Sequence, residues 1–357
     1  MSTVQPRLIP APAGAGVPNN HPSAVDPTDF PGPGVQVLSA REVPLGGPRA
    51  MTVRRTLPHR ERSFIGAWCF SDHYGPERVS ANGGMDVAPH PHTGLQTVSL
   101  LFTGEIEHND SAGGRGLVRP GEINLMTAGH GISHSEVSTP DTTILHGMQL
   151  WTALPGAHRD TAPRSFENYV PEPRHLPWGT QVEYLGENSP VTVYSRLVLH
   201  ELLIDASNTA ILPLDPTFEY GILPDNAAVT VTVEPVNTDS GDTDETDEFT
   251  VEPAALACIS PGAGELRITA GGGGRTRVIL LGGEPLDESI IMFWNFIGRS
   301  HEEVVGMQEE WNRENSDESA EHSRFGTVAN YTSHDPDGVS WLPSPPVPDH
   351  AKLRPRR

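Results

Sequence analysis

The sequence has few cysteines, few basic residues and no long apolar run, and each shortage argues against a class of protein. Its two cysteines, Cys69 and Cys258, lie far apart in apolar segments, which predicts buried free thiols rather than a disulfide framework. Lys and Arg together number 24 against 46 Asp and Glu, and the net charge of -22 disfavours direct binding to nucleic acid or to an anionic membrane. No apolar stretch approaches the roughly 18 residues of a membrane span, and the first residues lack the basic-then-apolar order of a signal peptide. We therefore expect a cytoplasmic protein.

Glycine and proline are abundant instead. The 36 Gly and 35 Pro among 357 residues favour many turns and short strands over long helices. Apolar and β-branched stretches recur between Gly or Pro turns, which is typical of an all-β barrel or sandwich. A chain of this length is expected to form two domains. We predict a flexible arm over residues 1–40, a first barrel over 41–170, a second barrel over 171–300, and a C-terminal helix and tail over 301–357.

Two short motifs in the first half carry the candidate chemistry. Residues 89–94 read PHPHTG and place His90 and His92 two positions apart, and His134 and Glu136 have the same spacing further along. Side chains at positions i and i+2 of an extended segment point to the same face. If both segments are strands of one barrel, three imidazoles and one carboxylate can meet in its interior, and this donor set suits a first-row divalent metal. We therefore predict a metal site made of His90, His92, His134 and Glu136.

The remaining segments offer less chemistry. The Pro-rich residues 155–177 are predicted to be a crossover or a linker. Residues 171–300 contain no HxH or HxE, so the second barrel is expected to lack a metal. The acidic run at residues 239–248 lacks the spacing of a calcium loop and is expected to be a solvated hairpin loop. Ser300 and Glu303 form a capping box before apolar residues at helical spacing, which predicts one C-terminal helix.

Taken in order, these motifs resemble those of the pirin family. The segments HPHTGLQTV, GEIEHNDS and PGEINLMTAGHGISHSE carry the resemblance, which is specific over about residues 54–170 and weaker over 180–300. Pirins are bicupins, so the resemblance implies two cupin-type β-barrels. In pirins a metal, usually iron, is bound at the positions that correspond here to His90, His92, His134 and Glu136. Fe(II) is therefore the expected cofactor, although another divalent transition metal would also suit these donors.

Three positions depart from the usual pirin pattern. Thr93 and Gln96 stand where pirins usually carry Arg and Glu, and His130 replaces an Arg. The changes leave the ligand positions intact, so metal binding is expected to persist. Substrate choice and redox tuning are expected to differ, because groups around the ligands set both. His130 is consistent with the rim of the cavity and equally with a turn.

The other histidines and the tryptophans are assigned structural roles. His73, His108 and His146 are expected to be structural or solvent-facing rather than ligands. Trp151, Trp294 and Trp311 are expected in the core before any ligand-stacking role, because their large apolar surface favours burial.

Similarity to pirins with quercetin 2,3-dioxygenase activity implies an iron-dependent dioxygenase acting on a flavonol-type substrate. Glu136 would be both ligand and catalytic base, because a carboxylate near a substrate hydroxyl can accept its proton. Zinc would fill such a site but could not support the redox step. The alternative is a non-catalytic regulator, in which the oxidation state of the metal alters a surface that binds a transcription factor or a metabolic enzyme. The chain is expected to be a monomer with no direct nucleic-acid or membrane partner.

Overall fold

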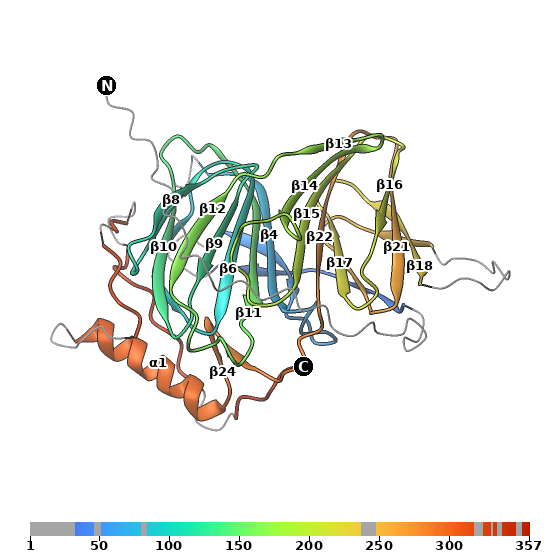
Figure 1. Cartoon of the computed structure of the whole chain (residues 1–357). Helices are drawn as coiled ribbons and strands as arrows, with labels where there is room; N and C mark the ends of the chain where they lie inside the picture. Colours follow the sequence, from blue (N-terminus) through green and yellow to red (C-terminus); the bar gives the residue numbers. More distant parts are fainter. Residues whose placement is uncertain are drawn as a thin grey trace.

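The computed structural model describes residues 33–45, 51–79, 84–236, 248–317, 324–329, 331–333, 338–347 and 352–357. Over these residues the chain forms β-strands and one α-helix, arranged as two β-rich halves side by side (Figure 1). The predicted all-β class with a short C-terminal helix is confirmed for this part of the chain. The predicted acidic hairpin loop, except for Glu248, and residues 1–32 of the predicted arm lie outside the described residues.

The first half packs two antiparallel sheets against each other. Its seven-stranded sheet has the spatial order β12 (Ser165–Tyr169), β9 (Ile123–Thr127), β6 (Leu95–Thr103), β11 (Ile144–Ala153), β4 (Trp68–Arg78), β3 (Thr52–Leu57) and β2 (Arg41–Pro44). Its four-stranded sheet has the order β5 (Asp86–His92), β10 (Ile132–Ser138), β7 (Ile106–Asp110) and β8 (Arg115–Val118). Buried side chains from both sheets, including Val53, Tyr74 and Val87, share one apolar cluster.

The second half repeats this arrangement. Its seven-stranded sheet has the order β1 (Val35–Leu38), β20 (Leu256–Ile259), β17 (Glu219–Pro224), β22 (Thr276–Gly283), β15 (Leu197–Ile204), β14 (Gly179–Leu185) and β13 (Arg174–Leu176). Its four-stranded sheet has the order β16 (Thr209–Pro213), β21 (Ala263–Ala270), β18 (Val229–Pro235) and β19 (Glu248–Val251). Alternation explains why these segments are strands, because β18 buries Val229, Val231 and Val233 while the residues between them are half-buried.

The two seven-stranded sheets pack against each other through an apolar cluster with residues from both halves. Trp68, Val98 and Leu150 from the first half share a fully buried cluster with Leu199 and Leu281 from the second. The indole Nε1 of Trp68 also donates a hydrogen bond to the carbonyl of Gly282 at 3.0 Å, which satisfies the one polar atom of this buried ring.

Two segments differ from the sequence-based expectation. The predicted linker at residues 155–177 contains β12, which pairs with β9, and β13, which pairs with β14. Pro163 and Pro171 lie just outside β12, so prolines bound the strand rather than prevent it. Residues 35–38 of the predicted arm form β1, which pairs with β20 and adds an edge strand to the sheet of the second half.

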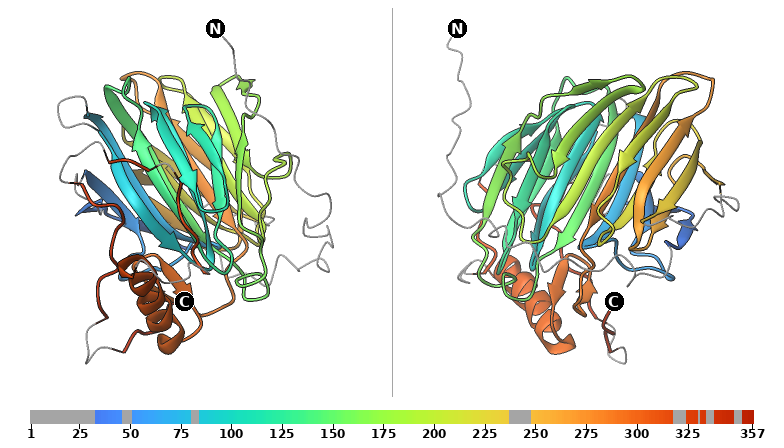
Figure 2. Two further views of the ribbon diagram at one scale, coloured as in Figure 1. Left: turned by 90° about the vertical axis from the view of Figure 1, so that its left-hand side faces the viewer. Right: turned by 45° about the vertical axis from the view of Figure 1, so that its right-hand side comes forward.

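The C-terminal region returns to the first half. A short hairpin of β23 (Ile291–Phe293) and β24 (Phe296–Gly298) precedes helix α1 (His301–Ser316), which lies below the first half in the views of Figures 1 and 2. Ser300 caps the helix as predicted, because its Oγ accepts the backbone N–H of Glu303 at 3.1 Å. Val304, Met307 and Trp311 form its buried apolar stripe. None of the helical structure in the described ranges is long and apolar enough to span a bilayer.

Candidate metal centre

The register of β5, β10 and β7 brings the predicted site residues to one face of the four-stranded sheet. His134 lies opposite His90 across the β5–β10 pair, and a bulge follows before Glu136. On the other side of β10, His108 of β7 lies opposite Glu136, and Asp110 lies opposite His134. Directly opposed residues share a face, so these side chains point into the space between the two sheets of the first half.

Three of the four predicted ligands form one buried group. One ring nitrogen from each of His90, His92 and His134 lies within 4.8 Å of the others, and all three residues are buried. The Nε2 atoms of His92 and His134 are 3.0 Å apart. The Nδ1–H of His90 donates to the carbonyl of Ala88 at 2.9 Å, which leaves Nε2 of that ring unprotonated when the imidazole is neutral.

Burial keeps these three imidazoles neutral. Desolvation lowers the pKa of His90 to about 4, and it holds the pKa of His92 and of His134 well below the ordinary value. Neutral imidazoles retain the lone pairs that a metal ion requires.

The donor set fits a transition-metal ion. Two imidazole nitrogens at right angles on one ion, each about 2.1 Å from it, are about 3 Å apart. The separation of 3.0 Å between the Nε2 atoms of His92 and His134 agrees with that requirement. His90 completes a group of three nitrogen donors, and its ring makes a hydrogen bond to a backbone carbonyl through the other nitrogen, Nδ1.

Glu136 lies beside this group and forms a second one with His108 and His134. Its carboxylate oxygen lies within 4.8 Å of ring nitrogens of His134 and His108. Ser99 Oγ of β6 donates to Oε1 of Glu136 at 3.0 Å, which fixes the carboxylate against the seven-stranded sheet. Burial raises the pKa of Glu136 above its ordinary value.

His108 is the residue that the sequence-based reasoning did not select. It is buried beside His134 and Glu136, so the solvent-facing alternative predicted for it is wrong, and its exclusion from the ligand set stays a prediction. The signal was present in the alternation of residues 106–110, where Ile106, His108 and Asp110 occupy one face of β7 and are all buried. The sequence Asn109-Asp110-Ser111 is typical of a turn. The last two residues of β7, Asn109 and Asp110, are therefore not recognisable as strand residues from the sequence.

The opposite wall of the space is aromatic. Trp151 of β11 stacks on Phe70 of β4 with ring centroids 3.9 Å apart, and its ring lies 5.1 Å from that of His92 in an edge-to-face arrangement. Arg55 lies over the Phe70 ring at 4.3 Å and makes two hydrogen bonds of 2.6 Å to Asp72. Trp151 is buried as expected, but its Nε1 has no hydrogen-bond partner within the described part of the chain.

The side chains at the three positions that depart from the pirin pattern have their partners outside the histidine group. Gln96 donates to the hydroxyl of Thr127 and to the carbonyl of Thr192, both at 2.9 Å. Thr93 donates to the carbonyl of Ile297 at 3.3 Å. His130 is half-exposed and lies beside Arg324 and Asp160.

A further group, of two histidines and one aspartate, lies between the halves. Oδ1 of Asp225 accepts hydrogen bonds from Nε2 of His73 and of His146, each at 2.7 Å, and Oδ2 accepts one from Arg277 at 3.0 Å. These contacts hold the pKa of the Asp225 carboxyl well below its ordinary value. The distances are those of strong hydrogen bonds, and the positive charge of Arg277 is shared between Asp225 at 3.0 Å and Glu201 at 2.7 Å. We interpret this group as a polar contact that joins the halves, although its three ligand atoms also lie within 4.8 Å of one another. His73 and His146 are buried, so the solvent-facing alternative is wrong for both, and their exclusion from the ligand set stays a prediction.

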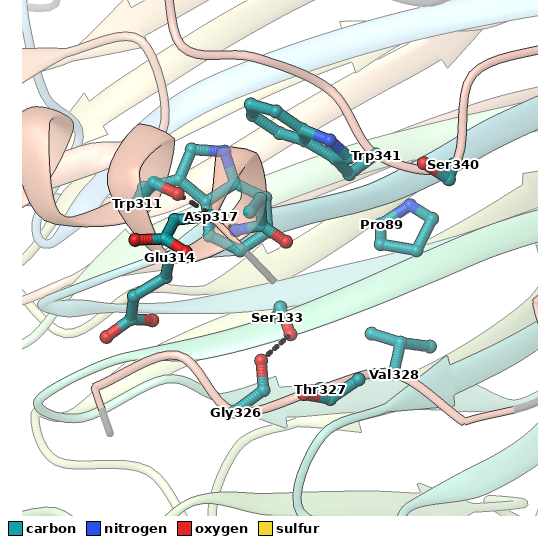
Figure 3. Close-up of a pocket in the computed structure, with 11 residues that line it drawn as sticks. Pro89, Ser133, Trp311, Glu314, Asp317, Gly326, Thr327, Val328, Ser340 and Trp341 are labelled. Atoms are coloured by element: carbon teal, nitrogen blue, oxygen red, sulfur yellow. Dashed lines mark hydrogen bonds between the residues drawn. The ribbon is translucent and has the colours of Figure 1, made fainter. Parts of the chain in front are cut away.

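A hollow of about 240 Å³ lies on the outer face of the four-stranded sheet (Figure 3). It is lined by Pro89 and Ser133 of the sheet, by Trp311 of α1 and by Trp341 of the C-terminal segment. Pro89 and Ser133 precede His90 and His134, so by strand alternation their side chains point away from the histidine group. The hollow is therefore behind the candidate metal centre and is not its entrance.

The chain matches two family models. The family model described as "Pirin" matches residues 50–152, and the model described as "Pirin C-terminal cupin domain" matches residues 223–317. A Pseudomonas aeruginosa protein named "Putative quercetin 2,3-dioxygenase" is 40% identical over 282 residues, which cover 78% of this chain and 83% of that protein.

Solved structures show the same fold. The structure described as quercetin 2,3-dioxygenase from Acinetobacter baumannii has a TM-score of 0.76 at 33% identity, and the match covers 89% of this chain and 97% of that chain. The bacterial pirin YhhW from Escherichia coli, solved in complex with nickel(II), has a TM-score of 0.52 at 16% identity and covers 70% of this chain and 99% of that chain.

Proposed function

This chain belongs to the pirin family, and from that premise we propose that it is an iron-dependent dioxygenase that acts on a flavonol-type substrate. The observation that carries the proposal is the buried group of His90, His92 and His134 with Glu136 beside it. These four residues would hold Fe(II). Bound there, Fe(II) would supply the redox chemistry with dioxygen and a positive charge that favours the ionised form of a substrate hydroxyl.

Glu136 is the proposed base. Its carboxylate is buried and faces the same space as the three histidines, so it can accept the proton of a hydroxyl that enters this space. Burial raises its pKa, which makes it a better proton acceptor than an exposed carboxylate. The hydrogen bond from Ser99 holds Oε1 of Glu136 in place and leaves Oε2 to bind the metal or to accept the proton.

The aromatic wall supports a flat, oxygen-bearing aromatic substrate. Phe70 and Trp151 present apolar surface beside His92. The buried indole N–H of Trp151 lacks a partner among the described residues, and a buried donor of this kind gains free energy when it meets an oxygen acceptor. Such a wall excludes water from the three histidines and positions the ring of a flavonol against the aromatic side chains.

The test is oxygen uptake and loss of the quercetin absorbance band by iron-loaded protein, beside His134→Ala and His73→Ala variants. His73→Ala is a control at a buried histidine of the first half outside the proposed ligand set. The variant loses the contact with Asp225, so circular dichroism first verifies that it is folded at the assay temperature. We expect turnover by the wild type and by His73→Ala, and none by His134→Ala. Equal turnover by His134→Ala would assign the reaction to free iron and refute the proposal.

The regulatory alternative makes the opposite prediction in the same assay. A wild-type sample verified to hold iron would then turn over no quercetin, and a protein partner would be the next target.

Cytoplasmic residence is part of the proposal, because both cysteines are free and buried.

A further inference from the structure

His134 uses both of its ring nitrogens. Its Nε2 faces Nε2 of His92 at 3.0 Å, and its Nδ1 lies 3.3 Å from Nδ1 of His108. His108 Nε2 in turn lies 3.2 Å from Oδ2 of Asp110. His134, His108 and Asp110 are 1%, 2% and 5% exposed, so water does not compete for these contacts.

For neutral His134 and His108 rings, the contacts among His134, His108 and Asp110 allow only one placement of the two ring protons. An ionised carboxylate only accepts, so the proton of His108 is on Nε2 and is donated to Asp110. His108 Nδ1 is then a bare acceptor, and the proton of His134 must be on Nδ1 to meet it. His134 Nε2 is thereby left bare and directed at the group formed with His90 and His92.

We propose that Asp110 and His108 are positioning residues that fix the proton of His134 on Nδ1 and so keep its Nε2 lone pair available to a metal ion. The inference rests on the metal site of the proposed function and extends it by two residues. Metal-bound histidines commonly donate their second N–H to a carboxylate, and removing such a partner costs 10–100-fold in metal affinity. Here a second imidazole is inserted between the carboxylate and the ligand.

Both positioning residues are themselves held in place. The His108 ring stacks on Phe166 with centroids 4.1 Å apart and planes 10° from parallel. Oδ1 of Asp110 accepts the backbone N–H groups of Ala112 and Gly114, each at 2.8 Å, which leaves Oδ2 for His108. A Cβ at Gly114 would lie 2.2 Å from Oδ2 of Asp110, so the turn closes on this carboxylate only with glycine there.

The first experiment measures Ni²⁺ affinity by competition with a chromophoric chelator. Asp110→Asn removes the charged acceptor, and His108→Phe retains the stacked ring on Phe166 but removes the Nδ1 acceptor. Asp86→Asn is the matched control, because Asp86 is a buried carboxylate of the same sheet that accepts from Tyr331 and Ser333 instead. Circular dichroism verifies that each variant is folded.

We expect the dissociation constant for Ni²⁺ to rise about 10–100-fold in Asp110→Asn and His108→Phe, and to stay within about threefold of wild type in Asp86→Asn. An Asp110→Asn affinity within threefold of wild type overturns the proposal. Loss of stoichiometric binding in His108→Phe, equal to that in His134→Ala, also overturns it, because His108 would then be a ligand.

The second experiment separates this inference from the metal site itself. Long-range ¹H–¹⁵N spectra of the metal-free protein report which ring nitrogen of His134 carries the proton. We expect Nδ1–H in the wild type and a mixture of tautomers in Asp110→Asn. An Nε2–H wild type, or an unchanged spectrum in Asp110→Asn, refutes the inference even if Ni²⁺ binds. The expected spectra without any Ni²⁺ binding would support the positioning and refute the metal site.

Discussion

Replacing Asp225 with Asn should destabilise the whole protein, because one carboxylate joins the two halves. It accepts hydrogen bonds from His73 and His146 of the first half and from Arg277 of the second, at 2.7, 2.7 and 3.0 Å. The Asp225 side chain is 2% exposed. An amide can accept with its oxygen, but its NH₂ group would face one of these donors. Removing one partner of a buried charged contact typically costs about 3–5 kcal/mol, so the free energy of unfolding should fall by about that amount.

Urea denaturation of the metal-free protein at neutral pH measures this loss. Asp205→Asn is the matched control, because Asp205 pairs with Arg275 at 2.8 Å but both side chains are about half-exposed. An exposed pair contributes about 0–1 kcal/mol, so the control should be nearly as stable as the wild type. A loss below about 1 kcal/mol in Asp225→Asn would refute the view that this carboxylate joins the halves.

Three further predictions concern acid, metal and the helix cap. The folded-state pKa of His90, about 4, lies below the unfolded value of about 6.5, so the unfolded chain binds this proton more tightly. Stability of the metal-free protein should therefore fall as pH drops below about 6.5, by about 3 kcal/mol from His90 alone by pH 4; equal urea midpoints at pH 7.5 and 5 would contradict this. Ni²⁺ at 100 times its dissociation constant should add about 2.7 kcal/mol to the free energy of unfolding of the wild type and nothing to His134→Ala. Ser300→Ala should cost about 1 kcal/mol, measured as a lower melting temperature, because Glu303 N–H loses its acceptor.

Features fixed by local spacing were predictable from the sequence. The i, i+2 spacing of His90 with His92 and of His134 with Glu136 predicts same-face pairs, and β5 and β10 are strands that bring them together. The cap at Ser300 depends on residues three positions apart, and it forms as predicted.

Features fixed by pairing of distant segments were not predictable. Asp225 meets His73 and His146 across 152 and 79 residues of sequence, and only the packing of the two seven-stranded sheets brings them together. β12 is a strand because it pairs with the edge of β9, and no local sequence pattern shows that this edge is available for pairing. His108 was within reach of the alternation of β7, but turn-forming residues after it concealed the strand end.

The measurement that tests the central claim most directly is the iron content and X-ray absorption spectrum of iron-loaded wild type, His134→Ala and His73→Ala. The proposed site predicts one iron per chain in the wild type, with the scattering pattern of imidazole ligands. The same signal should persist in His73→Ala and disappear in His134→Ala. Iron that survives His134→Ala but is lost in His73→Ala would place the metal between the halves and contradict the account.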